Sequence, residues 1–199
     1  MVGDDTTLAA LIGSRICHDL ISPIGAIGNG LELLSMAGDV QGPEVALMSE
    51  SVASANARIR FFRIAYGLAP ADSLLGRAEV ARVIDDTFRG GRLSVVWMPE
   101  GDQPRQAVKI AFLCLQCLES AMPHGGEAVV RRDGPGWRIE GDAARLRIEP
   151  RLWGPLSNPD TILELTSSDV QFGVLRQIVR DRTPPLLVET GAQRIVMRF

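Results

Sequence analysis

Long apolar runs are missing from this sequence of 199 residues, and none approaches the roughly 18 to 20 apolar residues that a membrane-spanning helix needs. Residues 1–5 lack the basic start and the apolar stretch of a secretory signal. The net charge of −3 gives no sign of the basic surface that nucleic acids require. We therefore expect a cytoplasmic protein that binds neither a membrane nor nucleic acid.

Cysteine and histidine are also scarce, which limits metal and thiol chemistry. The three cysteines, Cys17, Cys114 and Cys117, cannot all pair with one another, and a reducing compartment explains this most simply. Cys114 and Cys117 have CxxC spacing but lie in an apolar run, and a zinc site would need further ligands nearby. The only histidines are His18 and His124. We predict buried core cysteines, His124 in a turn, and no bound metal or cofactor.

The first third of the chain has the apolar spacing of two long helices. Apolar residues recur at steps of three and four over residues 5–36, and again over residues 43–68 after the breakers at residues 37–43. The two stripes comprise Leu8, Ile12, Ile16, Leu20, Ile24, Ile27, Leu31 and Leu34, then Val45, Met48, Val52, Ala55, Ile59, Phe62 and Ala65 or Tyr66. Such helices form an antiparallel hairpin that cannot cover both of its apolar faces alone. We therefore predict a homodimer whose two hairpins form a four-helix bundle.

The rest of the chain alternates in type after a linker at residues 68–73. Helices are predicted at residues 77–88, 103–121 and 170–181. Strands are predicted at residues 92–97, 127–132, 137–141, 186–190 and 194–199, with a hairpin turn at residues 133–136. This order indicates an α/β sandwich, with helices on one face of a mixed sheet. The fold class is thus α+β, with a helical-hairpin dimerisation domain at residues 1–70 and an α/β domain at residues 71–199.

His18 is the residue of greatest chemical interest. Each helical residue turns about 100°, so His18 lies about 200° from both Ile16 and Leu20, opposite the apolar stripe. A solvent-facing imidazole beside Asp19 is a candidate nucleophile or proton carrier. Because adjacent helical side chains diverge, a direct hydrogen bond between His18 and Asp19 is not assumed. The alternative is an exposed histidine without a role.

Small and polar residues surround His18 on the same helix face, which leaves room for another protein to approach. Ser14, Ser22, Gly25 and Asn29 are candidate contacts for that partner, and a solvated helix face is the alternative. Arg15, one turn before His18, is placed to offset the charge of a phosphorylated imidazole. Arg58 and Arg63 on the second helix are further candidates, but the sequence does not fix the register between the helices.

Pro23 and the glycines after it disfavour a helix just beyond His18. A proline inside a helix costs about 3 kcal/mol, and Gly25, Gly28 and Gly30 each cost up to about 1 kcal/mol relative to alanine. A bend or a loosened turn here would be strain kept at a working site. The alternative is a close, glycine-lined contact between helices.

The segment His18-Asp19-Leu20-Ile21-Ser22-Pro23-Ile24 resembles the H-box of sensor histidine kinases, His-(Glu/Asp)-Leu-x-x-Pro-(Leu/Ile). In that family the H-box lies on the first helix of a dimeric helical hairpin, and its histidine accepts the phosphoryl group. The second part of the chain resembles the ATP-binding domain of these kinases in its order of elements.

The nucleotide-binding boxes of the kinases are missing. Residues 111–121 contain no asparagine to hold magnesium. Asp142 stands where the next box would begin, but Ala144 and Leu146 replace its glycines, and residues 164–169 replace a Gly-rich lid. We therefore expect no ATP binding.

An intact H-box with a degenerate ATP-binding domain resembles the ChpT-type histidine phosphotransferases of bacterial cell-cycle phosphorelays. The resemblance implies a homodimer that relays phosphate through His18, from the receiver domain of a hybrid kinase to the receiver domains of response regulators. It implies that Mg²⁺ is held by the receiver. Asp19 and Arg15 are the expected assistants of His18. Two alternatives stay open, namely an ATP-using kinase with unusual nucleotide boxes and a non-catalytic dimeric adaptor that binds receivers.

Overall fold

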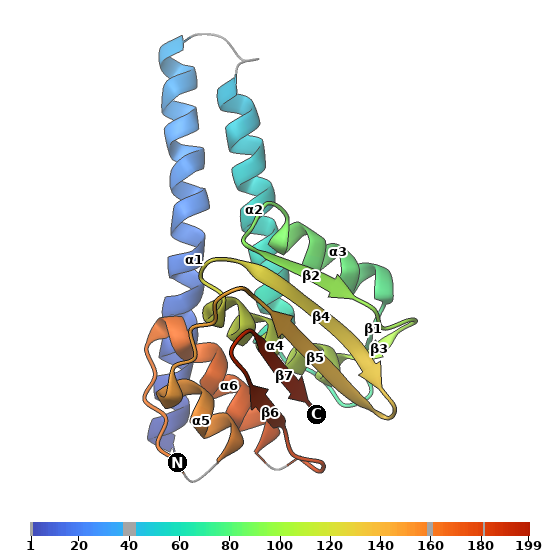
Figure 1. Cartoon of the computed structure of the whole chain (residues 1–199). Coiled ribbons are helices and arrows are strands. Elements are labelled where there is room, and N and C mark those ends of the chain that lie inside the picture. Colours follow the sequence, from blue (N-terminus) through green and yellow to red (C-terminus); the bar gives the residue numbers. More distant parts are fainter. Residues whose placement is uncertain (1, 38–42, 159–160, 181) are drawn as a thin grey trace.

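The computed structural model describes residues 2–37, 43–158, 161–180 and 182–199. A long helical hairpin, α1 (Val2–Ala37) and α2 (Pro43–Ala65), stands beside a unit of helices and a mixed sheet (Figure 1). The predicted α+β class is confirmed. The turn expected between the two helices lies outside the described residues, apart from its ends. Within the described residues, none of the helices combines the length and the hydropathy that crossing a membrane requires.

Helix α1 continues through Pro23 without interruption, over 36 residues. The bend or loosened turn expected after His18 therefore does not break the helix. Pro23 is buried, as is Gly30 two turns later, whereas Gly25 and Gly28 are exposed. A Cβ added at Gly25 or Gly28 would meet nothing within 4 Å, so these two glycines make no close helix contact within the chain.

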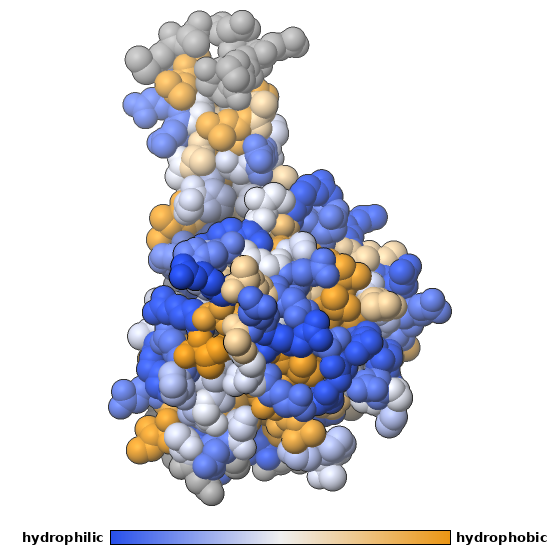
Figure 2. All heavy atoms as spheres, in the orientation of Figure 1, coloured by the Kyte–Doolittle hydropathy of each residue, from blue (hydrophilic) through white to orange (hydrophobic). Residues whose placement is uncertain are grey.

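The hairpin covers only part of its apolar surface. The predicted stripe of α1 is half-buried around Ile16, Leu20 and Ile27, but Ile24 and Leu31 expose 59% and 57% of their surface. On α2, Val52 and Ile59 are also exposed, although they belong to the predicted stripe. Apolar atoms accordingly lie on the surface of the hairpin where it extends beyond the α/β unit (Figure 2).

The sheet has five strands in the order β2-β4-β5-β7-β6. Strand β2 (Leu93–Trp97) is parallel to β4 (Gly126–Asp133), and all other pairs are antiparallel. Strands β5 (Gly136–Asp142), β6 (Leu187–Thr190) and β7 (Arg194–Arg198) complete the sheet. The predicted turn joins β4 to β5, and Gly134 there has φ +58, which glycine adopts readily.

Helix α4 (Arg105–Ala121) lies between the hairpin and the sheet, where it contacts α2, β4 and β5. Its residues from Ile110 to Leu118 are all buried, because both sides of the helix are covered. Phe61 of α2 stacks on Phe112 of α4 with ring centroids 4.6 Å apart, so the base of the hairpin and the α/β unit share one hydrophobic core. The boundary between residues 70 and 71 stays a prediction.

Three further helices flank this core. They are α3 (Arg77–Phe88), which contacts α2 and β2, α5 (Pro150–Ser157), and α6 (Val170–Val179), which contacts α1, α4 and α5. Cys114 and Cys117 are buried as predicted, and burial raises the pKa of both thiols. Trp97, Trp137 and Trp153 also lie in the core.

Some predicted boundaries are wrong. The helix expected from residue 103 begins at Arg105, because residues 103–104 form the short strand β3 (Gln103–Pro104), which pairs with β1 (Leu74–Leu75). Helix α5 was not predicted, since Pro150, Gly154 and Pro155 disfavour a helix. Pro150 stands at the first helical turn, where its missing N–H costs little. The 3₁₀ turn η1 (Ser167–Asp169) before α6 was not predicted either.

Candidate functional site

His18 projects from the middle of α1 into solvent, with 84% of its side chain exposed. Ser14, Ser22, Gly25 and Asn29 are exposed as well, and helical geometry places all four within about 40° of His18 around the axis. The predicted face of small and polar residues is therefore present on α1, and its atoms are accessible to another protein.

His18 and Asp19 are in direct contact. This contact was not expected, because the side chains of adjacent helical residues point in different directions. Nδ1 of His18 lies 3.1 Å from Oδ1 of Asp19. Arg15 accounts for this contact, because its Nε donates to Oδ2 of Asp19 at 2.9 Å. On the helix surface Arg15 lies one turn earlier and between the other two residues, so its attraction draws the carboxylate towards the imidazole.

Asp19 is the centre of a charged cluster that joins both helices of the hairpin. Its side chain is 10% exposed, and Nη1 of Arg58 on α2 lies 3.7 Å from its Oδ2. The structure thus sets the register that the sequence left open, and it brings Arg58, not Arg63, to the site. Arg63 lies about 140° around α2 from Arg58 and faces α3 instead.

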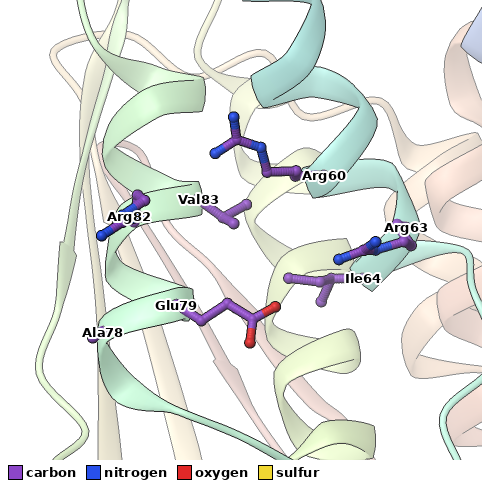
Figure 3. A pocket seen from close by; sticks show the side chains of 7 residues that line it. All are labelled: Arg60, Arg63, Ile64, Ala78, Glu79, Arg82 and Val83. Carbon is purple, nitrogen blue, oxygen red and sulfur yellow. The ribbon is translucent and has the colours of Figure 1, made fainter.

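A pocket of about 310 Å³ between α2 and α3 receives Arg63. It is lined by Arg60, Arg63, Ile64, Ala78, Glu79, Arg82 and Val83, and Glu79 points across it towards α2 (Figure 3). Nη1 of Arg60 lies 3.4 Å from Oδ2 of Asp86. This pocket is on the other side of α2 from Arg58 and is not part of the histidine site.

Arg15 also connects the site to the α/β unit. Its Nη1 donates to the backbone carbonyl of Ser168 at 2.8 Å. Arg15 was expected to offset the charge of a phosphorylated imidazole, but in this structure its Nε and Nη1 are bound to Asp19 and Ser168. Sequence reasoning missed Ser168. The pattern Thr166-Ser-Ser-Asp169 before an apolar helix, a capping-box signature, is the signal that marks this turn.

The imidazole has the chemistry of a nucleophile. A carboxylate that two arginines approach only accepts hydrogen bonds, so in neutral His18 the proton of the ring is on Nδ1, donated to Asp19. Nε2 then carries the free lone pair and points away from Asp19. An exposed nitrogen with a fixed tautomer is what attack on an electrophile requires.

The residues at the positions of the kinase boxes are engaged within the chain. Asp142 accepts from Nε and Nη2 of Arg194, at 2.6 Å and 3.1 Å. On α4, the Gln116 side chain accepts a hydrogen bond from the Tyr66 hydroxyl at 2.9 Å. Burial of this tyrosine raises its pKa. His124 lies in an exposed turn after α4, as predicted. No cluster of three or more histidine, cysteine or acidic residues suited to a metal occurs in the part of the chain that is described.

Comparison with known proteins shows the family of this chain. The family described as histidine phosphotransferase C-terminal domain matches residues 77–194. Protein phosphotransferase ChpT of Brucella abortus (strain 2308) is 37% identical over 153 residues, which are 73% of this chain and 72% of that protein. The chain belongs to the histidine phosphotransferase family. The resemblance stated from the H-box is thereby confirmed.

A solved structure extends the similarity to the hairpin. A bacterial phosphotransferase matches with a TM-score of 0.80 and 30% identity, covering 97% of this chain and 95% of that one. The histidine kinase domain from Erythrobacter litoralis EL346 matches more remotely, with a TM-score of 0.45 and 18% identity over 93% of each chain. The family match begins at Arg77, so the roles of His18 and its neighbours depend on the geometry of α1 and not on that match.

Proposed function

We propose that this histidine phosphotransferase carries a phosphoryl group on Nε2 of His18 between receiver domains in the bacterial cytoplasm. The donor is the receiver of a hybrid histidine kinase, and the acceptors are receivers of response regulators. The observation that carries the proposal is the exposed His18 imidazole, whose Nδ1 lies 3.1 Å from Asp19, within an H-box on the first helix of a hairpin.

The chemistry consists of two displacements at phosphorus. Nε2 of His18 attacks the aspartyl phosphate of a docked receiver, the N–P bond forms, and the P–O bond breaks with its electron pair remaining on the receiver's carboxylate. The proton on Nδ1, shared with Asp19, offsets the added negative charge. In the second step a carboxylate of the next receiver attacks phosphorus, and Nε2 leaves with its lone pair. Mg²⁺ is expected on the receiver, and positioning is the main contribution of this chain.

The receiver is proposed to dock on the exposed face of α1 around His18. Ser14 lies one turn before His18 and Ser22 lies one turn after it. Gly25 and Asn29 extend the same face by two further turns. Space around Gly25 is open, which allows the backbone of a partner to come close. Arg58 of α2 is 43% exposed and adds a cation beside Asp19.

We also propose that two chains pair through the apolar side of the hairpin. Ile21, Ile24, Gly28 and Leu31 fall within about 80° of one another on α1, and all four are exposed. Val52 and Ile59 present a similar face on α2. His18 lies about 60° from Ile21, at the near edge of this face, and about 120° from Ile24, so a four-helix bundle centred on Ile24 leaves the imidazole accessible.

The test is phosphoryl transfer from a labelled phospho-receiver to the full chain, with His18→Ala as the variant and His124→Ala as the matched control. The proposal requires acid-labile label on the wild type and on His124→Ala, none on His18→Ala, and none from Mg-ATP alone. Label from Mg-ATP would indicate a kinase. Receivers that bind without any transfer of label would indicate an adaptor.

A further inference from the structure

We infer that the turn at residues 166–169 is a positioning element for the phosphoacceptor, which acts through Arg15 and Asp19 to hold His18 in its Nδ1-protonated tautomer. This inference rests on the proposed function of His18. The turn belongs to the α/β unit and lies far from His18 in sequence, yet hydrogen bonds through the side chains of Arg15 and Asp19 connect the turn to the imidazole.

Arg15 is the link between the turn and the site. One guanidinium binds two acceptors, Oδ2 of Asp19 through Nε and the carbonyl of Ser168 through Nη1, at 2.9 Å and 2.8 Å. The planar guanidinium has a fixed fork of donors, so the position of the Ser168 carbonyl sets the direction in which Nε points. Only 21% of the Arg15 side chain is exposed, which limits other orientations.

Several hydrogen bonds hold the turn in place. Thr166 and Asp169 form a capping box, in which the backbone N–H of Asp169 donates to the Thr166 side chain and the backbone N–H of Thr166 donates to Oδ2 of Asp169 at 3.4 Å. Oγ1 of Thr166 also donates to this Oδ2, at 2.8 Å. Nη1 of Arg151 on α5 donates to the same Oδ2 at 3.1 Å. Asp169 is buried, so this carboxylate depends on these partners.

Packing holds the turn against α1. Both η1 and α6 contact α1, and a Cβ added at Gly173 of α6 would lie 3.1 Å from Cδ1 of Leu8 on α1. The hydrogen bond of Arg15 therefore joins two segments that are already in contact. A capped turn that only stabilised α6 would not need its carbonyl directed at the arginine that holds Asp19.

The consequence concerns the tautomer of His18. If the Ser168 carbonyl moves, Nε of Arg15 is no longer aimed at Asp19, and the carboxylate is free to turn to water. Nδ1 then loses its acceptor, and the ring proton divides between the two nitrogens. The nucleophilic Nε2 lone pair would be present in only part of the population.

The experiment compares Thr166→Val, which removes the hydroxyl at nearly constant shape, with Thr166→Ser, which keeps it. Thr190→Val in β6, an exposed position, is the matched control. Long-range ¹H–¹⁵N spectra of the full chain at about pH 8, above the ordinary pKa of imidazole, report the tautomer of each histidine. The chain has two histidines, so His124 serves as the internal reference.

We expect Thr166→Val to shift His18 away from the Nδ1-protonated form, leave His124 unchanged, and lower transfer from a phospho-receiver by on the order of 10-fold. Thr166→Ser and Thr190→Val should resemble the wild type in both measurements. An unchanged His18 tautomer in Thr166→Val would overturn the inference, whatever the transfer rate. If the wild type accepted no phosphoryl group, the proposed function would fail, while the spectra would still decide the positioning role.

Discussion

The side chain of Arg15 and the backbone carbonyl of Ser168 are joined by a hydrogen bond of 2.8 Å across 153 positions of sequence. The same arginine binds Asp19, whose other carboxylate oxygen lies beside Nδ1 of His18. The imidazole on the first helix and the turn before the last helix thus form one hydrogen-bonded unit. This connection gives the α/β unit a role at the site that does not require a nucleotide.

Asp19→Asn should lower the rate of phosphoryl transfer by on the order of 100-fold. Loss of a general acid or base typically lowers a rate by a factor of this size. Asparagine can present an N–H to Nδ1 in place of an oxygen, which favours the tautomer with Nε2 blocked. It also removes the charge that attracts Arg15 and Arg58. The measurement is the single-turnover rate from a phospho-receiver, with Asp72→Asn in the exposed linker as the control. Equal rates for the two variants would contradict the role given to Asp19.

Arg58→Gln and Arg63→Gln form a matched pair on α2 that tests the register of the hairpin. Nη1 of Arg58 is 3.7 Å from Asp19 and the Arg58 side chain is 43% exposed, so this ion pair should contribute at most about 1 kcal/mol, and loss of Arg58 should slow transfer by up to about 5-fold. Arg63 faces the pocket against α3, and its replacement should leave the transfer rate at the wild-type value. The opposite ranking in the same assay would mean that the two helices meet in another register.

Gly25→Ala should stabilise the chain by about 1 kcal/mol, because alanine favours a helix and its Cβ meets nothing within 4 Å. The same methyl group should slow transfer by on the order of 10-fold if a receiver packs closely there, since crowding a contact costs about 1–3 kcal/mol. Gly13→Ala is the control, with equally open space about 140° away from His18 on α1. Thermal unfolding of both variants measures the stability change, and transfer assays measure the effect on docking. Equal transfer rates for the two variants would count against docking at Gly25.

Ile24→Glu should convert the proposed dimer into monomers. Ile24 exposes 59% of its surface in the single chain, and burying such a side chain contributes about 1.5–3 kcal/mol per copy. We expect the dimer dissociation constant to rise by on the order of 100-fold. Ile162→Glu is the control, because Ile162 is 83% exposed and lies outside the hairpin. Sedimentation equilibrium measures both variants, and a monomeric wild type would refute the pairing itself.

Local patterns predicted much of this molecule. The periodicity of apolar residues located both hairpin helices, and it placed His18 opposite the stripe because a helix has a fixed turn per residue. The strand and turn signals located the five strands of the sheet within a few residues. The apolar run around Cys114 predicted burial, which the position of α4 between hairpin and sheet confirms.

The contacts between distant segments could not be predicted in this way. Periodicity orients a side chain about its own helix, but it does not say which residue of a neighbouring element lies opposite. For that reason Arg58 and Arg63 were equal candidates, and Ser168 was not a candidate at all. The His18–Asp19 contact was missed because it depends on a third residue, Arg15, which draws the carboxylate around the helix.

The nitrogen of the His18 ring that carries the phosphoryl group can be determined by NMR. Correlated ³¹P and ¹⁵N spectra of the ¹⁵N-labelled chain, recorded after transfer from a phospho-receiver, distinguish the two nitrogens of His18. Because Nδ1 is held by Asp19, we expect phosphorus to be bonded to Nε2 of His18 and to be absent from His124. Phosphorus bonded to Nδ1 of His18, or to any other residue, would contradict it.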